Sequence, residues 1–398
     1  MSASSLSSPQ RDGDRPSSWD YGFAGGGVAA LCLLRRLARD QPAARFLVVD
    51  PGDATAHHTY AYWSQRSDLL DDVVERSFER LEVVRSEGAL NLPLGAYRYR
   101  MFHLGQLRER TLAELAGHQA LLVDGRVSGI EDDEQGARFI LEDGRSYACG
   151  FAFDSRPPPL EPVPGASVSL LQSFHGVEVV LDEPRFDDER ATLMDFRTPQ
   201  EDGFTFGYVL PSSSQRAFVE TVRVSRAGHA PPDVESYLRE VLGTRSYHVV
   251  TEEGGATLLT DAPFGRRTGP RTLTLGLLGG RLKPSTGYAV ARILDDVQRV
   301  AKSLARFGHP FDLPVEPASY RALDRLMLEV MRDEPREIPR VLFSLFANNP
   351  TDRVLRFLDE EASKLERLAI VSSLPKGPFA RALAHRPARS DEDPGPPW

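Results

Sequence analysis

The sequence of 398 residues contains only two cysteines, Cys32 and Cys149. Two cysteines cannot build a disulfide framework, and these two lie in separate apolar stretches without the spacing of metal ligands. We therefore expect both to be buried packing residues in a protein of the reducing cytoplasm.

The chain also lacks long apolar runs and an excess of positive charge. No stretch approaches the ~20 apolar residues that cross a bilayer, and residues 1–18 have no hydrophobic core of a signal peptide. The 48 basic and 57 acidic side chains leave a net charge of −9, which argues against a nucleic-acid partner. Residues 1–18 and 386–398 have the composition of disordered segments.

Apolar residues, at 41% of the chain, are enough for a core in more than one domain. Residues 19–40, WDYGFAGGGVAALCLLRRLARD, predict a strand, a glycine turn and a helix. Residues 44–53, ARFLVVDPGD, predict a buried strand that ends in an acid at Asp50. Together these segments are typical of the first β-α-β unit of a doubly wound sheet.

Gly25, Gly27 and Ala30 fill the three positions of a G-x-G-x-x-G/A motif, and Asp50 follows about 20 residues later. This pattern allows a tight turn, a close approach of a pyrophosphate to a helix N-terminus, and a hydrogen bond from a ribose hydroxyl to the acid. It predicts a bound dinucleotide, and the alternative is a glycine-rich turn without a ligand. The meander-like residues 121–155 and a second glycine-turn-helix unit at residues 279–288 favour FAD over NAD.

The order of these patterns predicts an α/β fold of the glutathione-reductase-like flavoprotein type. We expect a Rossmann-type FAD-binding part over residues 19–160 and 266–310, with a mainly antiparallel β domain for the substrate inserted at residues 161–265. One helix is expected in that insertion, at residues 232–243. Helical periodicity over residues 311–385 predicts a helical C-terminal cap.

Several segments make residues 19–385 resemble the flavin-dependent lycopene cyclase family of carotenoid biosynthesis. They are MDFRTPQ (194–200), YVLP (208–211), KPSTGY (283–288) and NPTDRVLRFLDE (349–360), with weaker echoes in FDSRPP (153–158) and HTYAYW (58–63). The resemblance implies noncovalent FAD that acts in its reduced form, with NADPH as reductant and no net consumption of electrons. It also implies an isomerase that closes ionone rings at the ends of a linear carotenoid. The alternatives are a cyclase of another isoprenoid or polyene, a flavin monooxygenase, and a flavin-binding protein without activity.

Ring closure of a polyene needs an acid that remains protonated near neutral pH. In RAFVETVRV (216–224), strand alternation places Glu220 on one face with Phe218 and Val224, and Glu220 also matches the acid motif of the family. An edge-strand glutamate, or one paired with a neighbouring arginine, is the alternative. Asp195, in MDFRTPQ, is either a second acid or a structural partner of Arg197.

Two further groups are candidate contacts of substrate and cofactor. Tyr60, Tyr62 and Trp63 could stabilise a passing cation with their aromatic faces, or could simply be core residues. Pro284, Ser285, Thr286 and Gly287 would present backbone N–H groups to the flavin at a helix start, or would form a capping turn without a ligand. We predict no metal site, because His57 and His58 have no carboxylate at ligand spacing.

A carotenoid must be drawn from a membrane, so we expect the protein to lie on the inner face of the cytoplasmic membrane. RVLFSLFANNP (340–350) and DRVLRFLDE (352–360) combine basic residues with Leu and Phe at helical spacing, as a membrane-surface helix does. The alternative for each is a helix that packs in the core.

Overall fold

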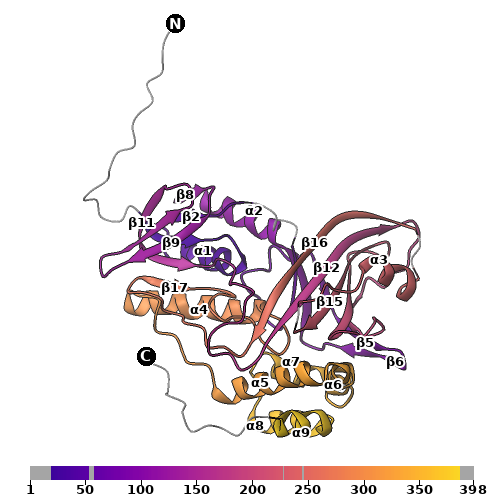
Figure 1. Ribbon diagram of the computed structural model, residues 1–398. Helices are drawn as coiled ribbons and strands as arrows, with labels where there is room; N and C mark the ends of the chain where they lie inside the picture. The colour runs from indigo at the N-terminus through magenta and orange to yellow at the C-terminus, as the bar shows by residue number, and fades with distance from the viewer. Residues whose placement is uncertain (1–18, 53–57, 227, 244–245, 386–398) are drawn as a thin grey trace.

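The computed structural model describes residues 19–52, 58–226, 228–243 and 246–385. Its elements form an α/β part, a large second sheet beside it, and a layer of helices beneath that sheet (Figure 1). The predicted terminal segments, residues 1–18 and 386–398, lie outside the described residues, as does His57.

The first sheet has the strand order β8-β2-β1-β11-β10-β9, with β17 paired to β11. Strands β1, β2, β8, β11 and β17 run parallel, and the β9-β10-β11 meander is antiparallel. The strands are β1 (Trp19–Ala24), β2 (Arg45–Val49), β8 (Gln119–Val123), β9 (Val127–Asp132), β10 (Ala137–Leu141), β11 (Ser146–Asp154) and β17 (Thr272–Thr274). The predicted β-α-β unit and meander are therefore confirmed.

Helices α1 (Val28–Asp40), α2 (Leu104–Leu115) and α4 (Val290–Phe307) accompany this sheet. Most residues of α1 are buried, and Leu33 and Leu37 share a core with Val297 and Val300 of α4. An amphipathic stripe on α4 thus closes the core that α1 forms with the sheet. Both cysteines are fully buried, as the sequence predicts.

The second sheet has the order β16-β12-β15-β14-β13-β5-β6. All its pairs are antiparallel except β5 with β13, so the predicted mainly antiparallel insertion is present. Its strands are β5 (Arg80–Arg85), β6 (Gly88–Pro93), β12 (Ser169–Leu181), β13 (Arg190–Asp195), β14 (Phe204–Pro211), β15 (Arg216–Ser225) and β16 (Tyr247–Thr260). The expected helix is a short α3 (Val234–Ser236) that continues as the π-helical turn η1 (Tyr237–Val241).

Strands β5 and β6 come from a part of the chain that the sequence places with the FAD-binding part, before residue 160. β5 pairs with β13 in the register Arg80 to Arg190, a separation of more than a hundred residues. Local alternation carries no information about such a distant partner. The domain boundary predicted at residue 160 therefore assigns β5 and β6 to the wrong sheet. A small third sheet consists of β3 (Thr59–Ser64), β7 (Arg98–His103) and β4 (Arg76–Phe78). Its side chains contribute to the core of the α/β part and to the core of the second sheet.

The C-terminal region is helical, as expected, and lies under the second sheet (Figure 1). Its elements are α5 (Ala318–Asp333), η2 (Pro335–Glu337), α6 (Ile338–Ala347), α7 (Thr351–Leu358), α8 (Lys364–Ser373) and α9 (Lys376–Ala384). Leu345 and Phe346 of α6 share one core with Phe204 of β14 and with Trp63 and Tyr99 of the third sheet. The helices therefore cover the sheet face that looks toward the α/β part. Within the described residues, no helix is long and apolar enough to cross a membrane.

Candidate active site

The three glycines of residues 25–27 make the turn between β1 and α1. Gly25 has a φ of 94°, which L residues rarely adopt, and a Cβ there would approach the Ser155 carbonyl oxygen to 3.1 Å. A Cβ at Gly27 would meet nothing nearer than Ser155 Oγ at 3.9 Å. The first helical bond of α1 runs from Leu31 N to Gly27 O, so the N–H groups before Leu31 remain outside the helical ladder. This open glycine turn at a helix N-terminus fits a pyrophosphate.

Asp50 follows β2 directly and holds this turn in place. Its carboxylate accepts hydrogen bonds from Gly26 N at 2.6 Å and Gly52 N at 2.9 Å, and it pairs with Arg108 of α2 at 2.5 Å. Ala30, the third motif position, is buried in the core beneath the turn. The structure brings the predicted motif residues together, and adds Arg108, which no sequence pattern indicates.

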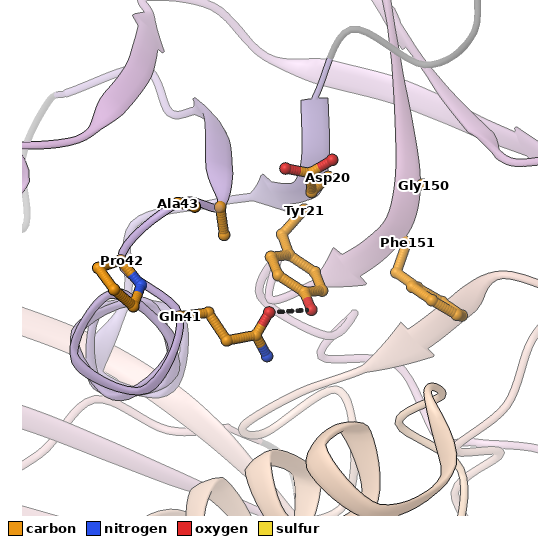
Figure 2. Close-up of a pocket in the computed structure, with 8 residues that line it drawn as sticks. Asp20, Tyr21, Gln41, Pro42, Ala43, Gly150 and Phe151 are labelled. Carbon is orange, nitrogen blue, oxygen red and sulfur yellow. Dashed lines mark hydrogen bonds between the residues drawn. The ribbon is translucent and has the colours of Figure 1, made fainter.

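An open hollow lies at the opposite end of the same strands (Figure 2). It is lined by Asp20, Tyr21, Gln41 and Phe151, and the Tyr21 hydroxyl donates to Gln41 Oε1 at 2.8 Å. β1 begins at Trp19, so this hollow is at the start of the strand. Ligands of doubly wound sheets bind at the carboxyl ends of the strands, and we therefore place the cofactor site at Gly25 to Gly27 instead.

The KPSTGY segment is a turn that precedes α4, and not the helix start that the sequence predicts. α4 begins at Val290, and the N–H groups of Thr286 and Gly287 donate to the Lys283 carbonyl oxygen, at 3.2 and 2.8 Å. Pro284 and Gly287 close the turn, and Gly287 has a φ of 75° with its α-carbon against Gln172. The intramolecular bonds arise because a positive φ at Gly287 folds the chain back before the helix can start. Thr286 and Gly287 therefore do not present free N–H groups.

Side chains of the same turn anchor it to the C-terminal helices. Ser285 Oγ donates to Asp324 of α5 at 2.5 Å. The buried Lys283 ammonium contacts Asp324 at 3.1 Å and Glu360 at 3.0 Å. Trp63 Nε1 donates to Asp359 at 2.7 Å beside them. These contacts fix the position of Tyr288, whose carbonyl accepts from Lys283 N at 2.8 Å.

Glu220 lies on β15, an interior strand between β12 and β14, so it is not an edge-strand glutamate. The arginines proposed as its partners are engaged elsewhere: Arg216 pairs with Glu178, and Arg223 donates to the Glu201 carbonyl. Within the described part of the chain Glu220 has no ion pair. Burial, reinforced by the charge of Glu253, raises the pKa of Glu220 to about 8. At neutral pH this group is therefore a protonated carboxylic acid.

Two buried tyrosines, Tyr99 and Tyr208, and the half-buried Tyr288 form a cluster beside Glu220. Tyr208 is its neighbour across the β14–β15 pair, and the Tyr99 hydroxyl hydrogen-bonds to Tyr208 and, at 3.0 Å, to Tyr288. Trp63 packs against Tyr288 with ring centroids 4.7 Å apart. Burial raises the pKa values of Tyr99 and Tyr208 well above the ordinary range, which keeps both hydroxyls neutral. Tyr208 and Tyr288 belong to the family motifs YVLP and KPSTGY, but the sequence predicts no role for either. No sequence pattern indicates Tyr99.

Asp195 faces the other side of the second sheet. Its neighbour on β14 is Gly207, one residue from Tyr208 and so on the opposite face. One carboxylate oxygen accepts from the backbone N and Nε of Arg197, and the other accepts from Arg197 NH2 and from the Tyr237 hydroxyl. These contacts fit the structural alternative, a partner of Arg197, and place the group away from Glu220.

Of the three predicted aromatic residues on β3, Trp63 packs in the core of the second sheet. Burial, with the nearby charge of Glu253 on β16, raises the pKa of Tyr60 to about 12. Tyr60 stacks on Phe102 at 5.5 Å, and Tyr62 is buried with its hydroxyl donating to Asp68 at 3.0 Å. The two tyrosines share a face, as alternation predicts, and that face belongs to the core of the α/β part. Trp63 points the other way, because successive strand residues alternate.

Trp63 and Tyr288 also line a small apolar cavity of about 60 Å³ between the second sheet and the C-terminal helices. The other lining side chains are mostly apolar and come from β13, β14 and β15 and from α5, α6 and α7; examples are Met194, Phe206, Val224, Met331, Leu345 and Phe346. The cavity thus offers an apolar, aromatic wall next to the Glu220 cluster.

Glu253 is a second buried acid that the sequence did not indicate. It lies on β16, is 9% exposed, and accepts a hydrogen bond from Thr59 N at 2.8 Å. Burial raises the pKa of Glu253 to about 7, although Thr59 and the charge of His103 act in the opposite direction. In the sequence it follows Glu252 and precedes two glycines, so no apolar alternation distinguishes its face.

Comparisons with known proteins show which proteins this chain resembles. A family model described as lycopene cyclase protein matches residues 20–384. The chloroplastic lycopene beta cyclase of Arabidopsis thaliana is 24% identical over 356 residues, which are 82% of this chain and 67% of that protein. The lycopene beta-cyclase of Pantoea ananas is 25% identical over 403 residues, covering 92% of this chain and 97% of that protein.

Among solved structures, the flavin-dependent brominase Bmp2 superposes with a TM-score of 0.59 at 15% identity, over 92% of this chain and 98% of that one. At this identity the likeness shows the fold alone. The predicted Rossmann-type flavoprotein fold, with its inserted β domain and helical C-terminal region, is confirmed.

Proposed function

Because the chain belongs to the lycopene cyclase protein family, we propose that it closes ionone rings at the ends of a linear carotenoid, as an isomerase with no net redox change. The observation that carries this proposal is Glu220, an acid that stays protonated at neutral pH. Its neighbour Tyr208 is linked through Tyr99 to Tyr288, which lines the apolar cavity. Such an acid is what protonation of an unactivated double bond requires.

In the proposed reaction Glu220 donates its proton to the terminal double bond of the polyene. The tertiary cation that forms is attacked by the next double bond of the chain, which closes the six-membered ring. The faces of Trp63 and Tyr288 stabilise the positive charge, and the apolar lining keeps water away from it. The cavity is far smaller than the end of a polyene, so a polyene end enters only when lining side chains move, and Met194 and Met331 are the most adaptable of these.

The residues at the carboxyl ends of β1 and β2 fit FAD as the cofactor. Gly25 has the positive φ that the tight turn needs, and the N–H groups before Leu31 lie outside the helical ladder of α1, as pyrophosphate binding requires. Asp50 lies at the end of β2, where a ribose hydroxyl can reach it. When bound, reduced FAD would supply an electron-rich ring that stabilises positive charge, and we propose NADPH as the reductant.

The decisive experiment incubates the purified protein, loaded with FAD and reduced without oxygen, with lycopene in liposomes, and separates the carotenoids by chromatography. We expect cyclic product and no stoichiometric loss of NADPH. Unchanged lycopene with FAD-loaded protein would reject this substrate. Consumption of NADPH and oxygen in proportion to product would instead support a monooxygenase, the second candidate.

We also propose that the protein docks on an anionic membrane surface, through α8 and α9 and not through the two helices indicated by the sequence. On α6 and α7, residues Val341, Leu345, Val354 and Leu355 are buried. On α8, Leu365, Leu368 and Val371 recur at helical spacing and are 79%, 66% and 43% exposed.

Charge on this surface also favours an anionic bilayer. Residues 362–385 carry the basic side chains Lys364, Arg367, Lys376 and Arg381 against one acid, Glu366, in a chain whose net charge is negative. Lys364 and Lys376 are exposed and make no ion pair within the described residues. A leucine face with exposed lysines is typical of helices that lie on anionic lipid. The substrate would then enter from the inner leaflet of the cytoplasmic membrane.

Replacing Leu365 and Leu368 with glutamate should reduce binding to vesicles that contain an anionic phospholipid by at least tenfold in flotation, because it removes apolar contact and adds like charge. The control replaces Leu122 and Leu160, which are 51% and 43% exposed in the α/β part, with glutamate. Equal binding by the two double variants would reject this docking face.

A further inference from the structure

Glu220 and Glu253 occupy one rung of the second sheet. Gly176 of β12 is the neighbour of Glu220 on β15 and of Glu253 on β16. Neighbouring residues of adjacent strands project to the same face, and two strand spacings put the two α-carbons about 10 Å apart. Both carboxyl groups therefore project to the same side of the sheet, one on each side of Gly176.

The residue between them has to be glycine. A Cβ at Gly176 would lie 2.4 Å from the Phe218 ring and 3.4 Å from Glu220 Cβ. The Phe218 ring thus lies over the gap between the two acids and is part of the low-polarity environment that they share. Any larger residue at position 176 would displace that ring.

Glu253 is held by elements outside its own sheet. Thr59 N, at the start of β3, donates to it at 2.8 Å, and the Thr59 hydroxyl contacts His103 Nδ1 at 3.3 Å. His103 Nε2 pairs with Glu75 at 3.1 Å, and the Glu75 side chain is 30% exposed. A series of polar groups thus leads from the buried acid to Glu75, which is partly exposed to solvent.

We infer that Glu253 is the second acid–base residue of this site, the one that takes up the proton released at ring closure and returns it to Glu220. The inference rests on the proposed cyclase function. It follows from the position of the two acids on one rung, and from the contacts that anchor Glu253 on β3.

The proton balance of the reaction is then complete. Glu220 loses its proton as a C–H bond forms at the terminal alkene carbon, and the electrons of the second double bond form the ring C–C bond. A C–H bond next to the ring cation breaks, its electron pair becomes the ring double bond, and its proton passes to the Glu253 carboxylate. Transfer of that proton from Glu253 to Glu220 restores the starting state, so nothing is oxidised or reduced.

The charges around the two acids agree with this assignment. Groups whose charge or hydrogen bonds act on Glu253 are Thr59 of β3 and His103 of β7, both of which favour its charged form. Glu220 is faced by Glu253 and by the neutral hydroxyls of Tyr208 and Tyr288, and within the described residues neither hydroxyl donates a hydrogen bond to it. Near neutral pH Glu253 is thus the acid that ionises first and is free to accept a proton, and Glu220 is the one that still carries a proton to donate.

The test compares Glu253→Gln with Glu252→Gln in the reduced holoenzyme, with lycopene in liposomes. Glu252 is the matched control, because it precedes Glu253, is 66% exposed and pairs with His175. We expect Glu253→Gln to lower kcat by about 10²-fold or more with FAD still bound, Glu253→Asp to recover part of the rate, and Glu252→Gln to stay within about twofold of the wild type.

A pH profile separates this role from a merely structural one. Loss of the Glu253 charge should let Glu220 ionise more readily, so the alkaline limb of the residual activity of Glu253→Gln should move to lower pH. Activity of Glu253→Gln above half that of an active wild type, or an unmoved limb, would overturn the inference and leave the proposed function standing. A wild type that forms no ring from any linear carotenoid would overturn both.

Discussion

Glu220→Gln is expected to lower the rate of ring formation by about 10²- to 10⁴-fold, the range that a positioned general acid contributes. Glutamine keeps the size of the side chain but has no proton to give to a carbon atom. FAD should remain bound, because the glycine turn of residues 25–27 belongs to the other sheet. The measurement is cyclic carotenoid formed per bound flavin, with Glu240→Gln, an exposed glutamate of the same domain, as control.

The pH dependence of the wild type gives an independent check on the same residue. The acid works only when protonated, and burial with the nearby charge of Glu253 raises the pKa of Glu220 to about 8. Activity should therefore persist at neutral pH and fall as the pH rises through about 8. A normal glutamate would lose its proton near pH 4.3, and activity would then be confined to acidic solution. Full activity of Glu220→Gln, or a profile that is flat through pH 9, would remove Glu220 from the acid role.

Lys283→Met is expected to lower the free energy of unfolding by about 3 kcal/mol, the lower end of the range for breaking a buried ion pair. Lys283 is 5% exposed and its ammonium holds Asp324 of α5 and Glu360, which follows α7. Removing the cation leaves two largely buried carboxylates with fewer partners. The measurement is the midpoint and slope of denaturant unfolding, with Lys302→Met, an exposed lysine on α4, as control.

A double variant tests whether the loss of stability in Lys283→Met comes from the unpaired carboxylate charge. In Lys283→Met/Asp324→Asn one buried charge of each sign is gone, so this double variant should recover part of the lost stability. Activity should fall in both variants, because the Lys283 ammonium anchors the turn that positions Tyr288 to Asp324 and Glu360. Equal stability of Lys283→Met and Lys302→Met would show that this ion-pair cluster adds nothing to the fold.

The α/β part was accessible from sequence because its signals are local. Gly25, Gly27, Ala30 and Asp50 lie within 26 residues and require special backbone geometry or a fixed place at a strand end. Glu220 was also accessible, since alternation alone assigns it to an apolar face. Local patterns do not show which residues of neighbouring strands lie beside Glu220.

The turn at residues 283–288 is a second case in which the sequence did not predict the contacts. Its sequence is specific enough to carry a family resemblance, but its backbone N–H groups bond within the turn and its Lys and Ser side chains bond to α5. Helical partners some forty residues away decide this role, and no local pattern reports them. The same holds for Asp195, whose second partner, Tyr237, follows 42 residues later.

By itself the sequence determined that residues 25–27 form a nucleotide-type turn, that the fold is of the flavoprotein type, and that Glu220 shares a face with apolar residues. Those properties depend on backbone geometry and periodicity, which neighbours in the chain fix. Only the tertiary structure decided that Gly176 brings Glu253 onto the rung of Glu220, that Tyr99, Tyr208 and Tyr288 meet there, and that the leucines of α8 remain outside. Strand register and helix docking set these contacts, because they join residues that are far apart in the chain.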